Sequence, residues 1–265
     1  MTRLHQSFRP VGGAVPRATA HDPGALRHGR TRRASSLMRR YEAAALLADL
    51  SISFQSHVAP ANALFEEATT AFARGTLLPT VRGSVAIEDL LPGDYVESSE
   101  GAQPVTWIGS TSYVPGIEDD ATTLADLWRI TADGFGPGRP LADVVVGPAA
   151  RMVLSRPRLR SLIGGDRVLV PVSDFADGER ILQLRPAGSV QLYHFMLGRH
   201  GTVRVGGIEM ETYHPGKAAA MPQSLEMRRL FLSMFPNIAV IEDFGELTMT
   251  RTTRRVIEGL TAGAV

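Results

Sequence analysis

The sequence contains no cysteine. Disulfide bonds, thiolate metal sites and thiol nucleophiles are therefore all excluded. No stretch of 18 or more uncharged apolar residues is present, so the sequence predicts no membrane-spanning helix. The N-terminal region also lacks the apolar core of a secretory signal peptide, and we expect a cytoplasmic protein.

Lysine is almost absent, because Lys217 is the only lysine among the 28 basic residues. The formal net charge is +1, but its distribution is uneven. Residues 1–41 hold nine arginines and one acid, whereas the remaining chain carries 19 basic and 26 acidic residues. Residues 1–37 combine Gly, Pro and Arg without an apolar period, which predicts a disordered basic tail. Salt-sensitive binding of nucleic acid or another anionic surface by this tail is one alternative function.

Residues 38–64 are interpreted as a linker. The stretch MRRYEAAALLADL, residues 38–50, has apolar side chains at a spacing compatible with a short helix. Met38, at its start, is a candidate translation start.

From Phe65 the chain changes to short runs of Val, Ile, Leu, Thr and Trp, separated by Gly and Pro about every 8 to 12 residues. This pattern is typical of an all-β domain, and no helices intervene as a parallel sheet would require. After the strands around 85–108, we expect strands at 127–131, 144–146, 151–154, 168–172, 181–184, 190–197, 202–205 and 208–213. The last part, 217–265, contains two helical patterns and is predicted to form a C-terminal helical cap.

Four segments within residues 65–216 resemble bacterial Hint (hedgehog/intein-type) domains. AFARGTLLPT is similar to the first Hint strand, and VAIEDLLPGDYV followed by QPVTWIG matches an E-x-L-x-x-G-D turn and a W-I-G strand end. GPAARMVL aligns with the family's S-P-x-H-R segment, and LYHFMLGRHGTVRVGGIEMETYHPG with its closing hairpin. The resemblance implies a mainly β, compact Hint-like domain over 65–216, with short C-terminal helices and a disordered N-terminal tail.

Self-processing in that family begins when a Cys thiol attacks the preceding carbonyl, and a His lets the amide nitrogen leave protonated. The resemblance places Ala71 at the Cys position and Ala150 at the His position. A methyl group can neither attack a carbonyl nor transfer a proton. The resemblance therefore implies a pseudo-enzyme, a scaffold or protein-binding module for an unidentified protein partner. We expect no catalytic residue, cofactor or metal.

Paired alanines at two catalytic positions are also what an experimenter introduces to trap a precursor. The neighbouring positions have changed as well, because Gly147 stands where the family has Ser and Gly206 where it has Asn. A designer has no reason to make these changes, so we interpret the alanines as a natural loss.

The alternative hypothesis is residual self-cleavage through Thr70, because a hydroxyl supports an N-to-O shift when a base is within reach. The simpler interpretation of Thr70 is a polar residue at the entrance of a strand. His194 and His200 are the other candidates, and their simpler interpretation is hydrogen bonding at strand ends. Together with His214 and Glu211 they would form a metal-ligand set, but no tight ligand spacing supports a metal site.

The segment RPRLRSL, residues 156–162, places three arginines close together. Phosphate or nucleic-acid binding needs aromatic platforms or a wider basic field, and neither is visible around this segment in the sequence. We interpret the segment as a solvated face, and nucleic acid is not an expected partner.

Overall fold

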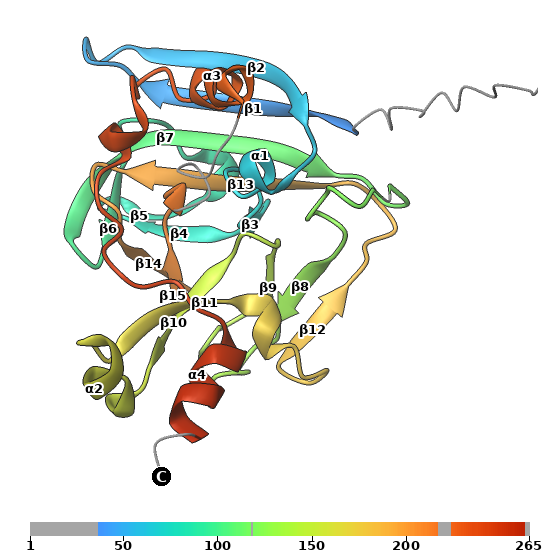
Figure 1. Ribbon diagram of the computed structural model, residues 1–265, viewed down its shortest axis with the longest axis vertical. Helices are drawn as coiled ribbons and strands as arrows, with labels where there is room; N and C mark the ends of the chain where they lie inside the picture. The colour runs from blue at the N-terminus through green and yellow to red at the C-terminus, as the bar shows by residue number, and fades with distance from the viewer. Residues whose placement is uncertain (1–36, 118, 217–223, 263–265) are drawn as a thin grey trace, which may run out of the picture. The chain divides into compact units, whose positions relative to one another are not determined.

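The computed structural model describes residues 37–117, 119–216 and 224–262. The predicted basic tail, except for Leu37, and residues 217–223 of the predicted cap lie outside them. Within the described part, fifteen strands join in one sheet (Figure 1), and the pairings between these strands are antiparallel. The mainly β fold predicted from the sequence is confirmed.

The strands of the first half are β1 (Met38–Leu46), β2 (Ile52–Pro60), β3 (Phe72–Ala73), β4 (Leu77–Thr80), β5 (Gly83–Ala86), β6 (Tyr95–Ser98) and β7 (Gly101–Tyr113). Those of the second half are β8 (Leu127–Ile130), β9 (Val144–Val146), β10 (Arg151–Ser155), β11 (Arg167–Pro171), β12 (Ile181–Leu184), β13 (Val190–Leu197), β14 (Thr202–Val205) and β15 (Ile208–Glu211). The strands of the second half lie within two residues of the expected positions.

The α-helices are short, and both helical patterns of the C-terminal part form helices. They are α1 (Ala63–Glu66), α2 (Arg160–Ile163), α3 (Leu225–Ser233) and α4 (Arg254–Ala262). Single 3-10 turns are η1 (Ile87–Asp89), η2 (Pro157–Leu159), η3 (Val172–Phe175) and η5 (Ile241–Phe244). Of the helices in the described ranges, none has both the length and the apolar character needed to cross a membrane.

The helix expected within residues 38–50 is wrong, because strand β1 stands there instead and forms a hairpin with β2. β1 also pairs with β7 over residues 42–45. Because side chains alternate between the two faces of β1, those of Tyr41, Ala43 and Ala45 lie together on one buried face. Alanine, leucine and arginine favour a helix locally, but hydrogen bonding to two neighbouring strands and burial of alternate side chains override that preference.

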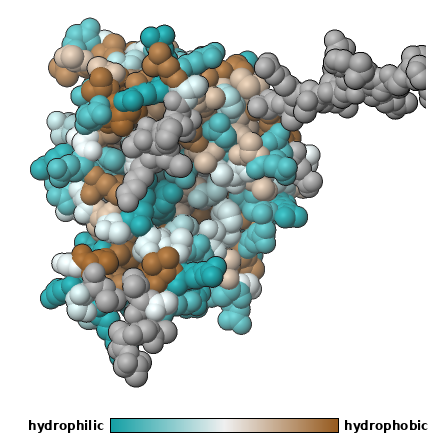
Figure 2. Space-filling model, in the orientation of Figure 1, coloured by the Kyte–Doolittle hydropathy of each residue, from teal (hydrophilic) through white to brown (hydrophobic). Residues whose placement is uncertain are grey.

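The buried face of this hairpin and Trp107 of the neighbouring β7 share one hydrophobic cluster with the C-terminal residues Phe231, Met234 and Phe235. Nε1 of Trp107 donates a hydrogen bond to the carbonyl oxygen of Met234 at 2.6 Å, and its ring stacks on Phe235. A Cβ added at Gly109 would lie 2.1 Å from the Trp107 ring, so the W-I-G motif needs its glycine. Apolar side chains also reach the surface where β2 and α3 lie (Figure 2).

The centre of the sheet positions the site. β13 lies between β7 and β3, and β3 pairs in turn with β9. Further along the chain, Gly206 and Gly207 form a two-residue turn between β14 and β15, both with positive φ, as a type I′ hairpin requires. This turn fixes the register that places Glu211 opposite Thr202.

Candidate functional site

Ala71 lies at the entrance of strand β3. Its N–H donates to the carbonyl oxygen of Tyr193 at 3.0 Å, and its own carbonyl oxygen accepts from the N–H of Gly147 at 3.0 Å. Gly147 begins the loop from β9 to β10, which contains Ala150. Ala71 and Ala150 are both buried in one hydrophobic cluster. The structure thus places the loop that contains Ala150 against the backbone of Ala71.

The peptide bond before Ala71 is packed closely by the same loop. The carbonyl oxygen of Thr70 accepts a hydrogen bond from the N–H of Ala149 at 3.2 Å. A Cβ added at Gly147 would lie 2.2 Å from this oxygen, so the serine of the family motif does not fit this backbone. An N–H aimed at a carbonyl oxygen is the type of donor that stabilises an oxyanion. The two side chains beside it, however, are methyl groups.

The hydroxyl of Thr70 is engaged in a structural contact. Oγ1 donates to the carbonyl oxygen of Glu66 at 2.8 Å, and the side chain is fully buried. A hydroxyl nucleophile needs a base within hydrogen-bond reach, and a peptide carbonyl is not such a base. The contact ties Thr70 to helix α1 instead.

His194, on β13, is a buried imidazole with one unused nitrogen. Nδ1 lies 3.0 Å from the carbonyl oxygen of Glu67, which assigns the proton to this nitrogen. Nε2 then presents a lone pair, and it has no hydrogen-bond partner among the described residues. Burial lowers the pKa of His194 to about 4, so the ring is neutral at pH 7. The rings of Phe72 and Tyr213 pack edge-on against it, with centroids at 5.8 and 5.2 Å.

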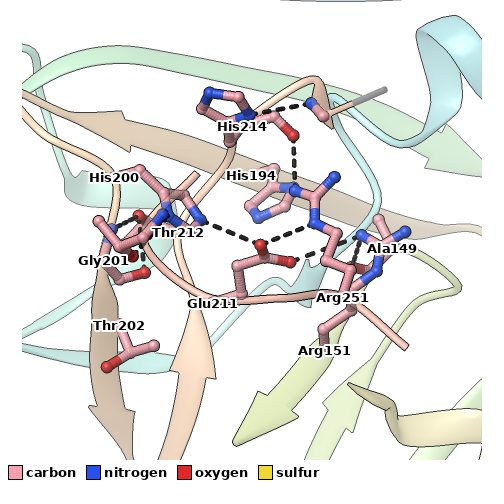
Figure 3. Close-up of polar contacts among 12 residues, drawn as sticks. Ala149, Arg151, His194, His200, Gly201, Thr202, Glu211, Thr212, His214 and Arg251 are labelled. Carbon is pink, nitrogen blue, oxygen red and sulfur yellow. Dashed lines mark hydrogen bonds and ion pairs between the residues drawn. The ribbon is translucent and has the colours of Figure 1, made fainter. Parts of the chain in front are cut away.

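His200 belongs to a separate polar network (Figure 3). Its Nδ1 accepts from the N–H of Thr248 at 3.1 Å, so Nε2 carries the proton and donates to Oε1 of Glu211 at 3.0 Å. The same oxygen accepts from Nε of Arg251 at 2.8 Å. Nη1 of Arg151 lies 3.6 Å from the other carboxylate oxygen. His200 is therefore a donor to a carboxylate, held in one tautomer.

Glu211 is ionised at the centre of this network although it is buried. Burial by itself raises the pKa of Glu211, but the hydrogen bond from His200 and the charges of Arg251 and Arg151 outweigh it and lower the pKa to about 2. A buried carboxylate is stable only when it is paired in this way. The network therefore ties the β14–β15 hairpin to β10 and to the segment before α4.

His214 is fully hydrogen-bonded within the protein. Its Nε2 donates to the carbonyl oxygen of Gly245 at 3.1 Å, and its Nδ1 accepts from the N–H of Gly216 at 2.9 Å. Across the described ranges, no group of three or more His, Asp or Glu side chains is arranged to hold a metal ion. The metal-ligand set considered from the sequence is instead a group of buried hydrogen-bonding side chains.

Sequence reasoning did not single out the two arginines beside Glu211. Arg151 follows Ala150 in the segment aligned with S-P-x-H-R, and this motif position was the only signal for it. Arg251 lies 40 residues after Glu211, and nothing in its local sequence distinguishes it from Arg254 or Arg255.

Comparison with known proteins identifies the family of the chain. The family model described as the Hint domain matches residues 70–217, more than half of the chain. The bacterial intein-like domain from Clostridium thermocellum is 18% identical with a TM-score of 0.38, over 55% of this chain and 99% of that one. A GSH-linked, splice-inactive variant of the AceL NrdHF class 3 split intein is 15% identical with a TM-score of 0.38, over 54% and 97%. No curated protein sequence matches the chain. The match to the family model shows that the chain belongs to the Hint domain family.

Proposed function

We propose that this protein is a Hint domain without self-processing activity, which serves as a scaffold or protein-binding module. The observation that carries the proposal is the pair of buried methyl groups, Ala71 and Ala150, beside the Thr70–Ala71 peptide bond. Neither methyl can supply nucleophilic or acid catalysis. The chain keeps the Hint fold without these reacting groups. A function that remains for such a domain is binding, and a partner protein would recognise its surface.

The remaining catalytic potential is small. Enzymes lower reaction barriers by about 8–23 kcal/mol, largely through groups of the kind that are missing at Ala71 and Ala150. A backbone donor such as the Ala149 N–H can still polarise the Thr70 carbonyl, but oxyanion donors without a nucleophile give only about 10³ to 10⁴-fold over water. That is far too little for self-cleavage on a laboratory timescale.

Residual self-cleavage through Thr70 is the competing function. The unpaired Nε2 of His194 favours it, because a neutral imidazole can accept a proton. Two observations oppose it: the pKa of His194 is lowered to about 4, and the Thr70 hydroxyl is hydrogen-bonded to the Glu66 carbonyl. A base of such low pKa is mostly ineffective in removing the proton of a hydroxyl at pH 7.

Intact mass spectrometry of the full chain tests these two functions. After incubation with hydroxylamine or dithiothreitol, which intercept esters and thioesters, we expect one species of 28.6 kDa. A time-dependent fragment that begins at Thr70 or Ala71 would overturn the proposal. If it appeared, Thr70→Ala should abolish it, whereas the control Thr69→Ala, also a buried threonine bonded to α1 carbonyls, should not.

Two finer points remain predictions from the sequence, namely the cytoplasmic location and the binding of anionic surfaces by the basic tail. Gel retention measures how much the tail contributes to binding of a nucleic acid. The full chain is compared with a chain lacking residues 1–36 at rising salt concentration. Equal retention of the two chains would exclude a contribution of the tail.

A further inference from the structure

A cavity of 890 Å³ is lined by residues of β10, β11, β14, β15 and helix α4, together with neighbouring loops. Small-molecule sites have volumes of about 300 to 1,000 Å³, so this cavity is of suitable size. None of its lining residues belongs to the polar network around Glu211. The cavity is therefore independent of the self-processing question.

The lining is strongly basic. It contains the six arginines Arg139, Arg156, Arg167, Arg180, Arg204 and Arg254, against Glu209 and Glu258. They come from five separate parts of the chain: the loop after β8, the loop before β12, the β10–β11 region, the β14–β15 hairpin and α4. The structure thus supplies the wider basic field that the sequence around residues 156–162 did not reveal.

Three of these arginines are already paired. Arg167 forms an ion pair with Glu209, Arg254 with Glu258 at 2.6 Å, and Arg180 with Asp177 at 2.7 Å.

The other three arginines, Arg139, Arg156 and Arg204, form no ion pair with a carboxylate in the described ranges. All three are exposed. Arg204 faces Glu209, which is already paired with Arg167, and the positive charges of all three arginines are exposed to an anionic ligand.

The cavity also has an apolar part. Two half-buried phenylalanines and five aliphatic or thioether side chains contribute to it: Phe135, Phe175, Met152, Val153, Leu154, Ile208 and Ile257. The guanidinium carbon of Arg254 lies 5.5 Å from the centroid of the Phe175 ring. Flat apolar surface and guanidinium groups therefore adjoin one another.

Arg204 and Arg254 are two of the basic groups that regular structure holds. Arg204 lies opposite Glu209 in the β14–β15 ladder, and the N–H of Arg254 donates to Asp174 at 2.9 Å at the start of α4. Side chains that regular elements position lose less entropy on binding than loop residues do.

We propose that this cavity binds a small phosphorylated molecule with a flat apolar body, the chemistry of a nucleoside polyphosphate. Guanidinium groups bind phosphate oxygens in pairs of parallel hydrogen bonds, which suits the unpaired Arg139, Arg156 and Arg204. The phenylalanine and aliphatic side chains then cover the body of the ligand. Inorganic phosphate would leave this apolar surface unused, and a nucleic-acid strand needs a groove with successive stacking platforms rather than one cavity.

The test is a titration of the full chain with a fluorescent ATP analogue, competed by ATP, pyrophosphate, adenosine or a single-stranded RNA oligonucleotide. We expect saturable binding that ATP displaces at lower concentration than pyrophosphate or adenosine. The double variant Arg139→Gln/Arg204→Gln should weaken binding about tenfold or more, because charged hydrogen bonds are lost. The matched control Arg158→Gln/Arg229→Gln removes two exposed arginines outside the cavity and should leave binding unchanged.

A third variant, Phe135→Leu, tests the apolar part. It should weaken displacement by ATP several-fold and leave displacement by pyrophosphate unchanged, and circular dichroism checks that each variant is folded. The proposal is overturned by an absence of saturable binding, or by equal weakening in both double variants. It is also overturned if pyrophosphate competes as well as ATP, which indicates a simple anion site, or if RNA competes better than ATP.

Discussion

The N–H of Ala149 donates to the carbonyl oxygen of Thr70 at 3.2 Å, so the loop before β10 lies directly against the peptide bond between Thr70 and Ala71. This contact forms without any reactive side chain in the loop. Gly147 makes it possible, because a Cβ there would lie 2.2 Å from the same oxygen. Close backbone packing at Gly147 is therefore a feature of this site in addition to the buried methyl groups of Ala71 and Ala150.

Replacing Gly147 with serine should destabilise the protein, although it restores the family's residue. The new Cβ would force the loop away from Thr70, and overpacking of this kind costs about 1–3 kcal/mol. The free energy of unfolding in urea measures the effect. Gly188→Ser is the control, since a Cβ there meets nothing within 4 Å. Equal stability of the two variants would contradict the close approach of Gly147 to Thr70.

A cysteine at position 71 would be the only thiol in the chain and therefore a specific probe of burial. Ala71 is fully buried, so we expect the thiol of Ala71→Cys to react with Ellman's reagent only after local opening, about a hundredfold more slowly than an exposed thiol. Ala102→Cys, at an exposed position on β7, is the control. Similar reaction rates in the native state would show that position 71 is accessible.

Glu211→Gln should remove a pH-dependent part of the stability. The pKa of Glu211 is lowered in the folded protein from 4.5 to about 2, so its stabilisation is present above about pH 4.5 and is lost as the pH falls towards 2. The shift corresponds to a stabilisation on the order of 3 kcal/mol. The difference in unfolding free energy between wild type and variant should therefore shrink between pH 4.5 and 2.

The exposed Glu97 provides the control for this comparison. Glu97→Gln should change the unfolding free energy by less than about 0.5 kcal/mol at neutral pH. A constant difference between wild type and Glu211→Gln over the whole pH range would show that the carboxylate is not held ionised by its partners.

His194 should remain neutral well below the pH at which histidines ordinarily titrate. Burial lowers its pKa from 6.5 to about 4, so stability from the neutral ring is present above pH 6.5 and is lost as the pH falls towards 4. Nitrogen NMR of labelled histidine should show a proton on Nδ1 and none on Nε2 at pH 5.5. Titration of His194 near pH 6.5 would contradict its burial.

The strands after residue 126 could be located from the sequence, because alternating side chains and turn residues are local features. The hairpin β1–β2 could not. Its first strand contains residues that favour a helix, and pairing with β2 and with the distant β7 makes it a strand. Glu211 was recognised as a motif residue, but its partner Arg251 could not be identified, because no local pattern links the two.

The amino-acid sequence alone excludes a thiol nucleophile, because the chain contains no cysteine and a methyl group at Ala71 or Ala150 has the same chemistry in any fold. It also determined the β-rich Hint domain, through motifs that follow one another in order. Only the tertiary structure decided which separated side chains meet, such as Arg251 with Glu211, or Arg139 with Arg204 around one cavity. The physical reason is that such proximity comes from long-range strand pairing, which no short stretch of the sequence encodes.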